Sequence, residues 1–276
     1  MKLSSIGWCD YSSGDLNFVR GCAPVSEGCT NCYARAIYER FGKDFSKVVC
    51  DEAALMRLRL AKFPKFSPKR GAPHKPVAFV CDTGDLFHPD VPADFATLVF
   101  EVLSYHRNVE WVVLTKRIER AREVLFGQEG NWFLGGGDYF PNIRLMVTAE
   151  NQARFDERVP ILLDCWEGPN GVSIEPMLGP VDVAEKLTCN GTKVNGECCE
   201  SYAVYGHHFH GLDLVIAGAE SGPKRRSFDV AWAEDVKAQC DAAGVSFFGK
   251  QDSGLRPGTP LLIEGREWKA WPKEEK

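Results

Sequence analysis

The sequence predicts an α/β fold: a full or partial (β/α) barrel-like parallel sheet with an N-terminal cysteine loop. Short, almost continuous apolar runs recur along the 276 residues, and a polar or glycine-containing turn and then a helical pattern follow each run. Such runs are typical of strands buried on both faces of a parallel sheet, and their alternation with helices is the pattern of an α/β domain. A doubly wound open sheet has the same pattern, so both arrangements stay open.

The strands are predicted from their β-branched and apolar content. They cover residues 77–81, 110–114, 143–148, 171–174, 212–217 and 245–248, and a first strand is expected near 17–20. Helices are predicted at 92–105, 118–126, 151–163 and 228–243. The last of these ends at Gly244, because glycine readily adopts the left-handed conformation that stops a helix. About seven strands in a single domain over residues 1–276 follow from this pattern.

One polar segment, residues 187–211, interrupts the pattern, and we interpret it as an insertion loop. It holds a group of possible metal ligands, namely Cys189, Cys198, Cys199, His207, His208 and His210. Their spacing matches no established metal motif, so an auxiliary metal site and a loop with some buried thiols both remain open.

Charge excludes a protein that coats nucleic acid through its whole surface, since the formal net charge is -5. A local basic stretch nevertheless occurs, because no acidic residue lies between Glu52 and Asp82. That interval contains Arg57, Arg59, Lys62, Lys65, Lys69, Arg70 and Lys75. The stretch is either a phosphate-binding surface or the solvated end of a helix followed by a loop.

The amino terminus lacks the apolar run of a signal peptide, and no stretch approaches the roughly 18 apolar residues that cross a bilayer. We therefore expect a cytoplasmic protein with no membrane partner. Disulfides are rare in that compartment, so metal binding is the leading explanation for some of the eleven cysteines.

Three of those cysteines, Cys22, Cys29 and Cys32, lie within eleven residues on a glycine-containing loop. A helix is expected to begin near Cys32. Thiolates are the preferred ligands of iron–sulfur clusters, and one short loop can place three of them around a cubane. Three ligands leave one iron open to a small molecule. A structural zinc site is the alternative, with its fourth ligand from another cysteine or from the 187–211 segment.

The segment Gly21-Cys22, Ser26-x-Gly28-Cys29-x-Asn31-Cys32-Tyr33-Ala34 resembles the opening of a phage-associated three-cysteine-motif family of poorly characterised function, related to the radical S-adenosylmethionine superfamily. Further passages match in order: DLFHxDVP from Asp85, LTKR from Leu114, VSIEPMLGP from Val172, GAESGP from Gly218 and FFGKQ from Phe247. Six residues separate the first two cysteines, where the usual radical motif has three, and two separate the last two, as in that motif.

The resemblance implies a [4Fe-4S] cluster on the three cysteines and S-adenosylmethionine at the open iron. One-electron cleavage of that cofactor gives a 5′-deoxyadenosyl radical, which abstracts hydrogen from an unknown substrate. An electron donor of the flavodoxin or ferredoxin type is then required. A nucleotide or nucleic-acid base is the expected substrate class.

Polar residues follow the predicted strands, at the edge where parallel α/β folds bind ligands. They are Asp82, Asp85, Thr115, Lys116, Arg117, Glu150, Asn151, Glu175, Glu220, Ser221, Lys250 and Gln251. The residues predicted to contact S-adenosylmethionine are Glu150, Asn151, Glu220, Ser221 and Gly222. The predicted catalytic residues are Asp85, Lys116 and Arg117, the last two as partners of a carboxylate or phosphate.

Two other functions compete with the radical enzyme. One is a zinc-stabilised nucleic-acid-binding protein without catalysis, whose basic stretch would bind nucleic acid with a salt-dependent affinity. The other is an iron–sulfur redox sensor that binds no S-adenosylmethionine.

Overall fold

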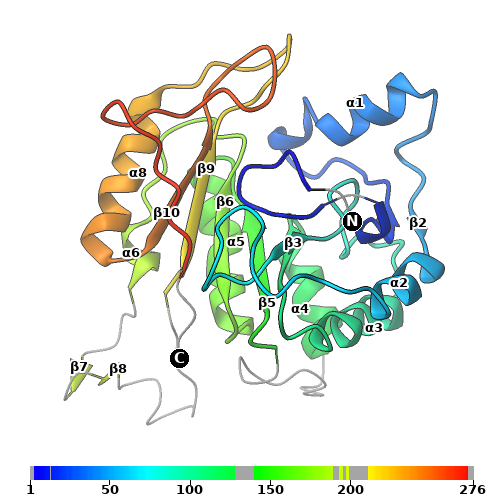
Figure 1. The fold of residues 1–276 in the computed structure, drawn as a ribbon. Helices are drawn as coiled ribbons and strands as arrows, with labels where there is room; N and C mark the ends of the chain where they lie inside the picture. The colour runs from blue at the N-terminus through cyan, green and yellow to red at the C-terminus, as the bar shows by residue number, and fades with distance from the viewer. Residues whose placement is uncertain are drawn as a thin grey trace.

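A six-stranded parallel sheet forms the centre of the protein (Figure 1). The computed structural model describes residues 3–12, 14–127, 140–188, 193–194, 197–198 and 211–272. In sheet order the strands are β10 (Ser246–Gln251), β9 (Leu214–Gly218), β6 (Asn170–Ile174), β5 (Ile143–Thr148), β4 (Glu110–Thr115) and β3 (Val77–Phe79). Each neighbouring pair is parallel. The six predicted strands are therefore confirmed, with ends that shift by up to three residues.

The strand order decides between the two arrangements that the sequence left open. The six strands lie side by side in chain order without the reversal that defines a doubly wound sheet. Since crossovers between parallel strands are right-handed, this order sends every connecting helix to the same face. The sheet curls into a half-barrel, which confirms the prediction of a partial (β/α) barrel.

The connecting helices are α3 (Ala93–Ser104), α4 (Ile118–Phe126), α5 (Gln152–Cys165), α6 (Ala184–Leu187) and α8 (Val230–Ala243). Side chains cap two of them: Asn151 accepts a hydrogen bond from Arg154 N at the start of α5, and Asp229 accepts one from Ala231 N before α8. Helix α8 ends at Gly244, whose φ of 71° is left-handed, as the sequence predicts.

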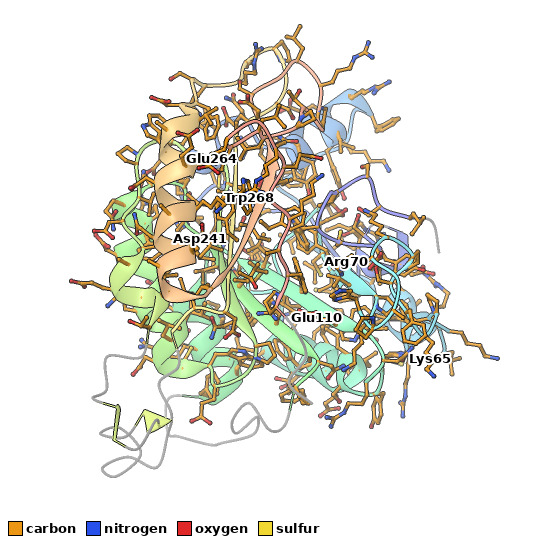
Figure 2. All side chains as sticks on the ribbon, turned by 60° about the vertical axis from the view of Figure 1, so that its left-hand side comes forward. Lys65, Arg70, Glu110, Asp241, Glu264 and Trp268 are labelled. Carbon is orange, nitrogen blue, oxygen red and sulfur yellow. The ribbon has the colours of Figure 1, made fainter. Side chains whose placement is uncertain are left out.

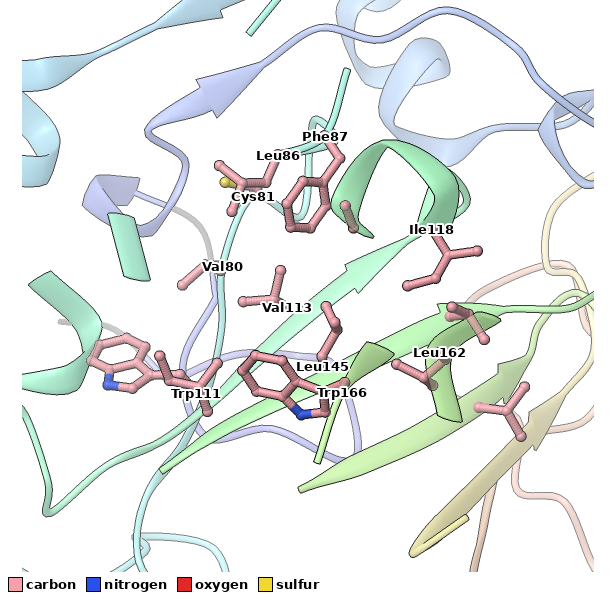
Figure 3. Close-up of a cluster of buried hydrophobic side chains, with 14 of the residues drawn as sticks. Val80, Cys81, Leu86, Phe87, Trp111, Val113, Ile118, Leu145, Leu162 and Trp166 are labelled. Atoms are coloured by element: carbon pink, nitrogen blue, oxygen red, sulfur yellow. The ribbon is translucent and has the colours of Figure 1, made fainter. Parts of the chain in front are cut away.

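The main core lies between the sheet and these helices (Figure 3). Val113 and Leu145 of the sheet pack with Ile118 and Leu162 of helices α4 and α5, and all four side chains are fully buried. Trp166, directly after α5, closes this layer. Burial of this kind stabilises by roughly 1.5–3 kcal/mol per large apolar side chain, so this layer fixes the positions of the strand ends.

The concave face of the half-barrel is filled by aromatic side chains from two segments distant in sequence. Trp8 and Trp271 stack with ring centroids 6.2 Å apart, and Trp8 also contacts Phe79 of β3 at 5.0 Å. Arg70 lies over the Trp271 ring at 4.9 Å. Residues before β1 and after β10 thus pack against each other inside the curl of the sheet.

The expected first strand at 17–20 is wrong as a seventh strand of this sheet. β1 (Val19–Arg20) pairs antiparallel with β2 (Val49–Cys50) in a separate two-stranded sheet. The strand has only two residues, Val19 and Arg20, and so short a segment does not encode its pairing partner. The same region contains η1 (Gly14–Leu16), η2 (Glu27–Cys29), α1 (Tyr33–Arg40) and α2 (Glu52–Arg59). Helix α1 begins directly after Cys32, as predicted.

Within the segment 187–211, the structure describes the pair β7 (Lys193–Val194) and β8 (Glu197–Cys198), which is antiparallel. The predicted cysteine and histidine cluster otherwise lies outside the described residues. Among the described helices, none is both long and apolar enough to cross a bilayer.

Candidate functional site

The loop that carries the three cysteines, residues 21–32 (the cysteine loop), lies over the carboxyl ends of the parallel strands. Its entry is fixed by backbone contacts, since Gly21 N donates to Thr83 O at 3.0 Å, just after β3. Gly21 has φ 88°, and a Cβ there would lie 2.3 Å from Lys47 O. Only glycine permits this approach, because any side chain would collide with the backbone.

Arg117, at the end of β4, donates hydrogen bonds to the first part of the cysteine loop. Its Nη1 donates to Cys22 Sγ at 3.4 Å, and its Nη2 donates to Ala23 O at 2.8 Å. The same Nη1 donates to Asp85 Oδ2 at 2.8 Å, which makes a buried ion pair. Two of the three residues predicted to be catalytic, Asp85 and Arg117, are therefore bonded to each other, and Arg117 is bonded to the loop.

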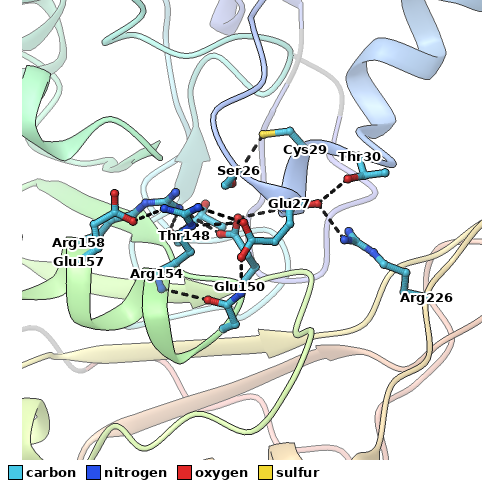
Figure 4. Close-up of polar contacts among 12 residues, drawn as sticks. Ser26, Glu27, Cys29, Thr30, Thr148, Glu150, Arg154, Glu157, Arg158 and Arg226 are labelled. Atoms are coloured by element: carbon cyan, nitrogen blue, oxygen red, sulfur yellow. Dashed lines mark hydrogen bonds and ion pairs between the residues drawn. The ribbon is translucent and has the colours of Figure 1, made fainter.

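Glu150, which follows β5, forms a hydrogen bond with the middle of the loop (Figure 4). This fully buried carboxylate accepts from Gly28 N at 3.1 Å and from Arg158 Nη1 at 3.0 Å. Burial would raise the pKa of Glu150, but a hydrogen bond from Ser26 and the charges of Lys116 and Arg158 outweigh it. The pKa of Glu150 is thus lowered, and the carboxylate stays ionised inside the protein.

Glu27 forms a second anchor beside it (Figure 4). Its carboxylate accepts from Asn151 Nδ2 and from Arg154 Nε, the latter at 3.3 Å, and its carbonyl oxygen accepts from Arg226 Nη1 at 2.8 Å. Asn151 thereby caps α5 with its oxygen and holds the loop with its nitrogen.

Glu220, directly after β9, holds the end of the loop. Its Oε2 accepts from Asn31 Nδ2 at 3.1 Å and from Arg226 N at 2.8 Å. Burial opposes the charge, but hydrogen bonds from Arg226 and Asn31 lower the pKa of Glu220 below its usual range. The neighbouring Gly222 has φ 107° and donates its N–H to Gly254 O at 2.9 Å.

The electrostatics of the thiols differ along the loop. Burial and the Asp85 charge raise the pKa of Cys22 despite Arg117. At Cys29 burial acts in the same direction, but the Lys116 charge and hydrogen bonds from Val25 and Ser26 prevail, so the pKa of Cys29 is lowered. The thiolate is the form of cysteine that binds metal, and of these two thiols Cys29 is the one whose surroundings favour it.

The thiols of the cysteine loop are suitable ligands for an iron–sulfur cluster, because its irons prefer thiolates. Among the residues that the structure describes, no three histidine, cysteine or acidic side chains converge closely enough to hold one metal ion. Cys22, Cys29 and Cys32 are all partly buried, none is in a disulfide, and two cations flank them. Three thiolates of one loop can bind three of the four irons of a [4Fe-4S] cluster.

Most of the predicted site residues lie around the cysteine loop. Asp85, Arg117, Glu150, Asn151 and Glu220 are joined to it directly or through one partner, as described above. Lys116 acts on Cys29 through its charge. Elsewhere at the same edge, Lys250 pairs with Glu175 at 3.0 Å.

Four residues of the site were missed by sequence reasoning: Tyr33, Arg154, Arg158 and Arg226. The phenol of Tyr33 donates to Asp82 O, and the three arginines neutralise Glu27, Glu150 and Glu220. One signal was available, because Arg154 and Arg158 follow Glu150 at helical spacing and so face the strand end.

The basic stretch is only partly available to a ligand. Lys69 Nζ donates to the carbonyl oxygens of Ile6 and Cys9, and Arg57 pairs with Asp15. Figure 2 shows Lys65 pointing away from the body of the protein, whereas Arg70 lies against it. Several basic side chains therefore stabilise the fold. Only exposed ones without such a role, such as Lys65, could belong to the predicted phosphate-binding surface.

Fold and site together define a class of protein: an α/β half-barrel with a three-cysteine loop at the carboxyl edge of its parallel sheet. Within it, the chain belongs to the family described as "Protein of unknown function (DUF5131)", whose model matches residues 3–269. The predicted relation to phage stays a prediction.

No curated protein has a matching sequence. Among solved structures, the chain is similar to one described as "Spore photoproduct lyase complexed with dinucleoside spore photoproduct". The identity is 11% and the TM-score 0.43, over 87% of this chain and 75% of that chain. A functional assignment therefore depends on the residues of this chain.

Proposed function

We propose that this chain is a radical S-adenosylmethionine enzyme with a [4Fe-4S] cluster on Cys22, Cys29 and Cys32. The observation that carries the proposal is the loop itself: three thiols outside any disulfide, anchored over the carboxyl edge of a parallel half-barrel beside Lys116 and Arg117. When bound, the cluster supplies the electron that cleaves S-adenosylmethionine to a radical able to abstract hydrogen from the substrate.

The residues of the chain contribute preorganisation. Glu150 with Arg158, and Glu220 with Arg226, hold the loop through buried or half-buried ion pairs. Because these contacts come from strand ends, the thiols keep fixed positions relative to the sheet. Lys116 favours the thiolate of Cys29, the form that binds iron.

Binding of S-adenosylmethionine is proposed for the same edge of the sheet. Ser221 and Gly222 are the best-supported contacts, because Gly222 lacks a side chain and no atom lies within 4 Å of a Cβ built there. The predicted contacts of Glu150, Asn151 and Glu220 to the cofactor remain proposals, and their observed contacts support a role in holding the loop.

A nucleotide or nucleic-acid base remains the proposed substrate class, and the exposed side chains of Arg59, Lys62 and Lys65, in a segment that contacts the residues before β4, are proposed to bind its phosphates away from the cysteine loop. The proposed electron donor is a flavodoxin or ferredoxin.

The test is anaerobic purification, reconstitution with iron and sulfide, and incubation with dithionite and S-adenosylmethionine, with 5′-deoxyadenosine as the product measured. We expect product from the wild type and none from a Cys29→Ala, Cys32→Ala variant. Cys50→Ala is the matched control, since Cys50 lies in β2 outside the cysteine loop. It should retain cluster and product.

Two results would overturn the proposal. Colourless protein with stoichiometric zinc and no product would point to the nucleic-acid-binding alternative. A bound cluster that takes up an electron but yields no 5′-deoxyadenosine would point to the redox sensor.

A further inference from the structure

We infer that Arg117 is a positioning residue that sets the reduction potential of the cluster through its hydrogen bond to Cys22. The inference rests on the proposed function, because it requires a cluster on the cysteine loop. It assigns Arg117 a role different from the predicted one, in which its guanidinium binds a carboxylate or phosphate of a ligand.

The guanidinium of Arg117 forms three hydrogen bonds with other groups of the protein. Nη1 donates to Cys22 Sγ at 3.4 Å and to Asp85 Oδ2 at 2.8 Å, while Nη2 donates to Ala23 O at 2.8 Å. The side chains of Arg117 and Asp85 are only 9% and 8% exposed. Three of the five N–H donors of this buried group already have protein partners, and one of those partners is the Cys22 sulfur.

The sheet, not the loop, determines where this guanidinium points. Thr115 Oγ1 accepts from Arg117 N at 2.9 Å and donates to Asp85 Oδ1 at 2.8 Å. Phe87 N also donates to Asp85 Oδ1, at 3.0 Å. The ends of β3 and β4 thus fix the carboxylate, the carboxylate fixes Arg117, and Arg117 reaches the first cysteine of the loop.

A hydrogen bond from a cation to a cluster sulfur stabilises the reduced state more than the oxidised state, because reduction adds one negative charge. Hydrogen bonds to the sulfurs are among the determinants of iron–sulfur potentials. Cys22 is the thiol with the direct arginine contact, whereas Cys29 is influenced by Lys116 through its charge. Arg117 should therefore raise the potential and make reduction easier.

The experiment measures the midpoint potential of the reconstituted full chain by redox titration with mediators, followed by electron paramagnetic resonance. Iron and sulfide content is measured first for every variant. Arg117→Gln removes the charge and most of the donors. Arg117→Lys keeps the charge but cannot bridge Asp85, Cys22 and Ala23 together. The matched control is Arg120→Lys, because Arg120 is partly exposed on α4 and pairs with Glu123.

We expect both Arg117 variants to bind cluster and to be harder to reduce. An about tenfold fall in the equilibrium constant for reduction corresponds to about 59 mV for one electron. The wild type should also show an exchangeable proton coupled to the reduced cluster, by electron–nuclear double resonance in H₂O and D₂O. That coupling should be absent from Arg117→Gln, and Arg120→Lys should match the wild type.

Full cluster content with a wild-type potential in both variants would overturn the inference. A wild-type potential in Arg117→Lys alone would also overturn it, since charge without the bridging hydrogen bonds would then suffice. If Arg117→Gln does not fold, Thr115→Val tests the same network with the arginine in place, and an unchanged potential and coupling would again refute it. A wild-type protein that holds no cluster would instead refute the proposed function.

Discussion

Replacing Glu150 by glutamine tests whether the cysteine loop depends on a buried ion pair. The substitution keeps the shape of the side chain but removes its charge beside Arg158, and both side chains are almost inaccessible to solvent. Arg158 then keeps the carbonyl oxygen of Thr148, at 2.7 Å, and loses its anionic partner. Breaking one partner of a buried pair costs about 3–5 kcal/mol, because the remaining charge is left uncompensated.

The loss can be expressed as a melting temperature. For 276 residues the entropy of unfolding is about 0.6 kcal/mol per kelvin, so the melting temperature should fall by about 5–8 °C. Thermal and urea unfolding of the metal-free protein measure both quantities. Glu157→Gln is the control, because Glu157 pairs with Arg154 at the surface of the same helix and should cost less than about 1 kcal/mol. A Glu150→Gln loss no larger than that of the control would refute the reasoning.

Three further predictions concern the same loop. Gly28→Ala would place a Cβ 2.7 Å from Glu150 Oε1, so it should cost about 1–3 kcal/mol in urea unfolding, whereas Gly179→Ala, with no atom within 4 Å, should cost less; equal costs would contradict this. In metal-free protein, Lys116→Gln should slow alkylation of Cys29 by iodoacetamide near neutral pH, because the ammonium lowers the pKa of that thiol; mass spectrometry of the labelled peptide measures the rate, and an unchanged rate would argue against the effect. Folding lowers the pKa of Glu150, so the stability contributed by its charge is fully present above the unfolded pKa of about 4.3 and is lost as the pH falls through the folded pKa. The difference in unfolding free energy between wild type and Glu150→Gln should therefore shrink only in acid. A difference that already shrinks near pH 6 would contradict this prediction.

The sequence predicted the strands well because each carries its own signal. Ile143–Thr148 is mostly apolar and buried on both faces, and its bounds are confirmed to the residue. The segment near 17–20 failed for the opposite reason: its pairing with Val49–Cys50 depends on a partner about 30 residues away, and two residues contain no periodicity. The choice between a half-barrel and an open sheet could not be predicted from the sequence pattern either, because the apolar runs do not encode strand order.

The sequence predicted the position of the site but not the hydrogen bonds and ion pairs within it. The rule that polar residues follow parallel strands located Glu150 and Glu220, which do lie beside the loop. Which cation neutralises each carboxylate depends on three-dimensional proximity. Arg226 donates a hydrogen bond to the carbonyl oxygen of Glu27, 199 positions away in the sequence, and no local sequence pattern predicts such a contact.

Those long separations have a consequence for synthesis of the protein. The cysteines leave the ribosome early, whereas two of the groups that anchor the middle of their loop, Glu150 and Arg226, follow 122 and 199 positions after their partners. During translation the three thiols are therefore carried on an unfolded segment, open to oxidants and to competing metals. The proposed cluster would then be held by all of its anchors only after β9 and the residues after it have emerged.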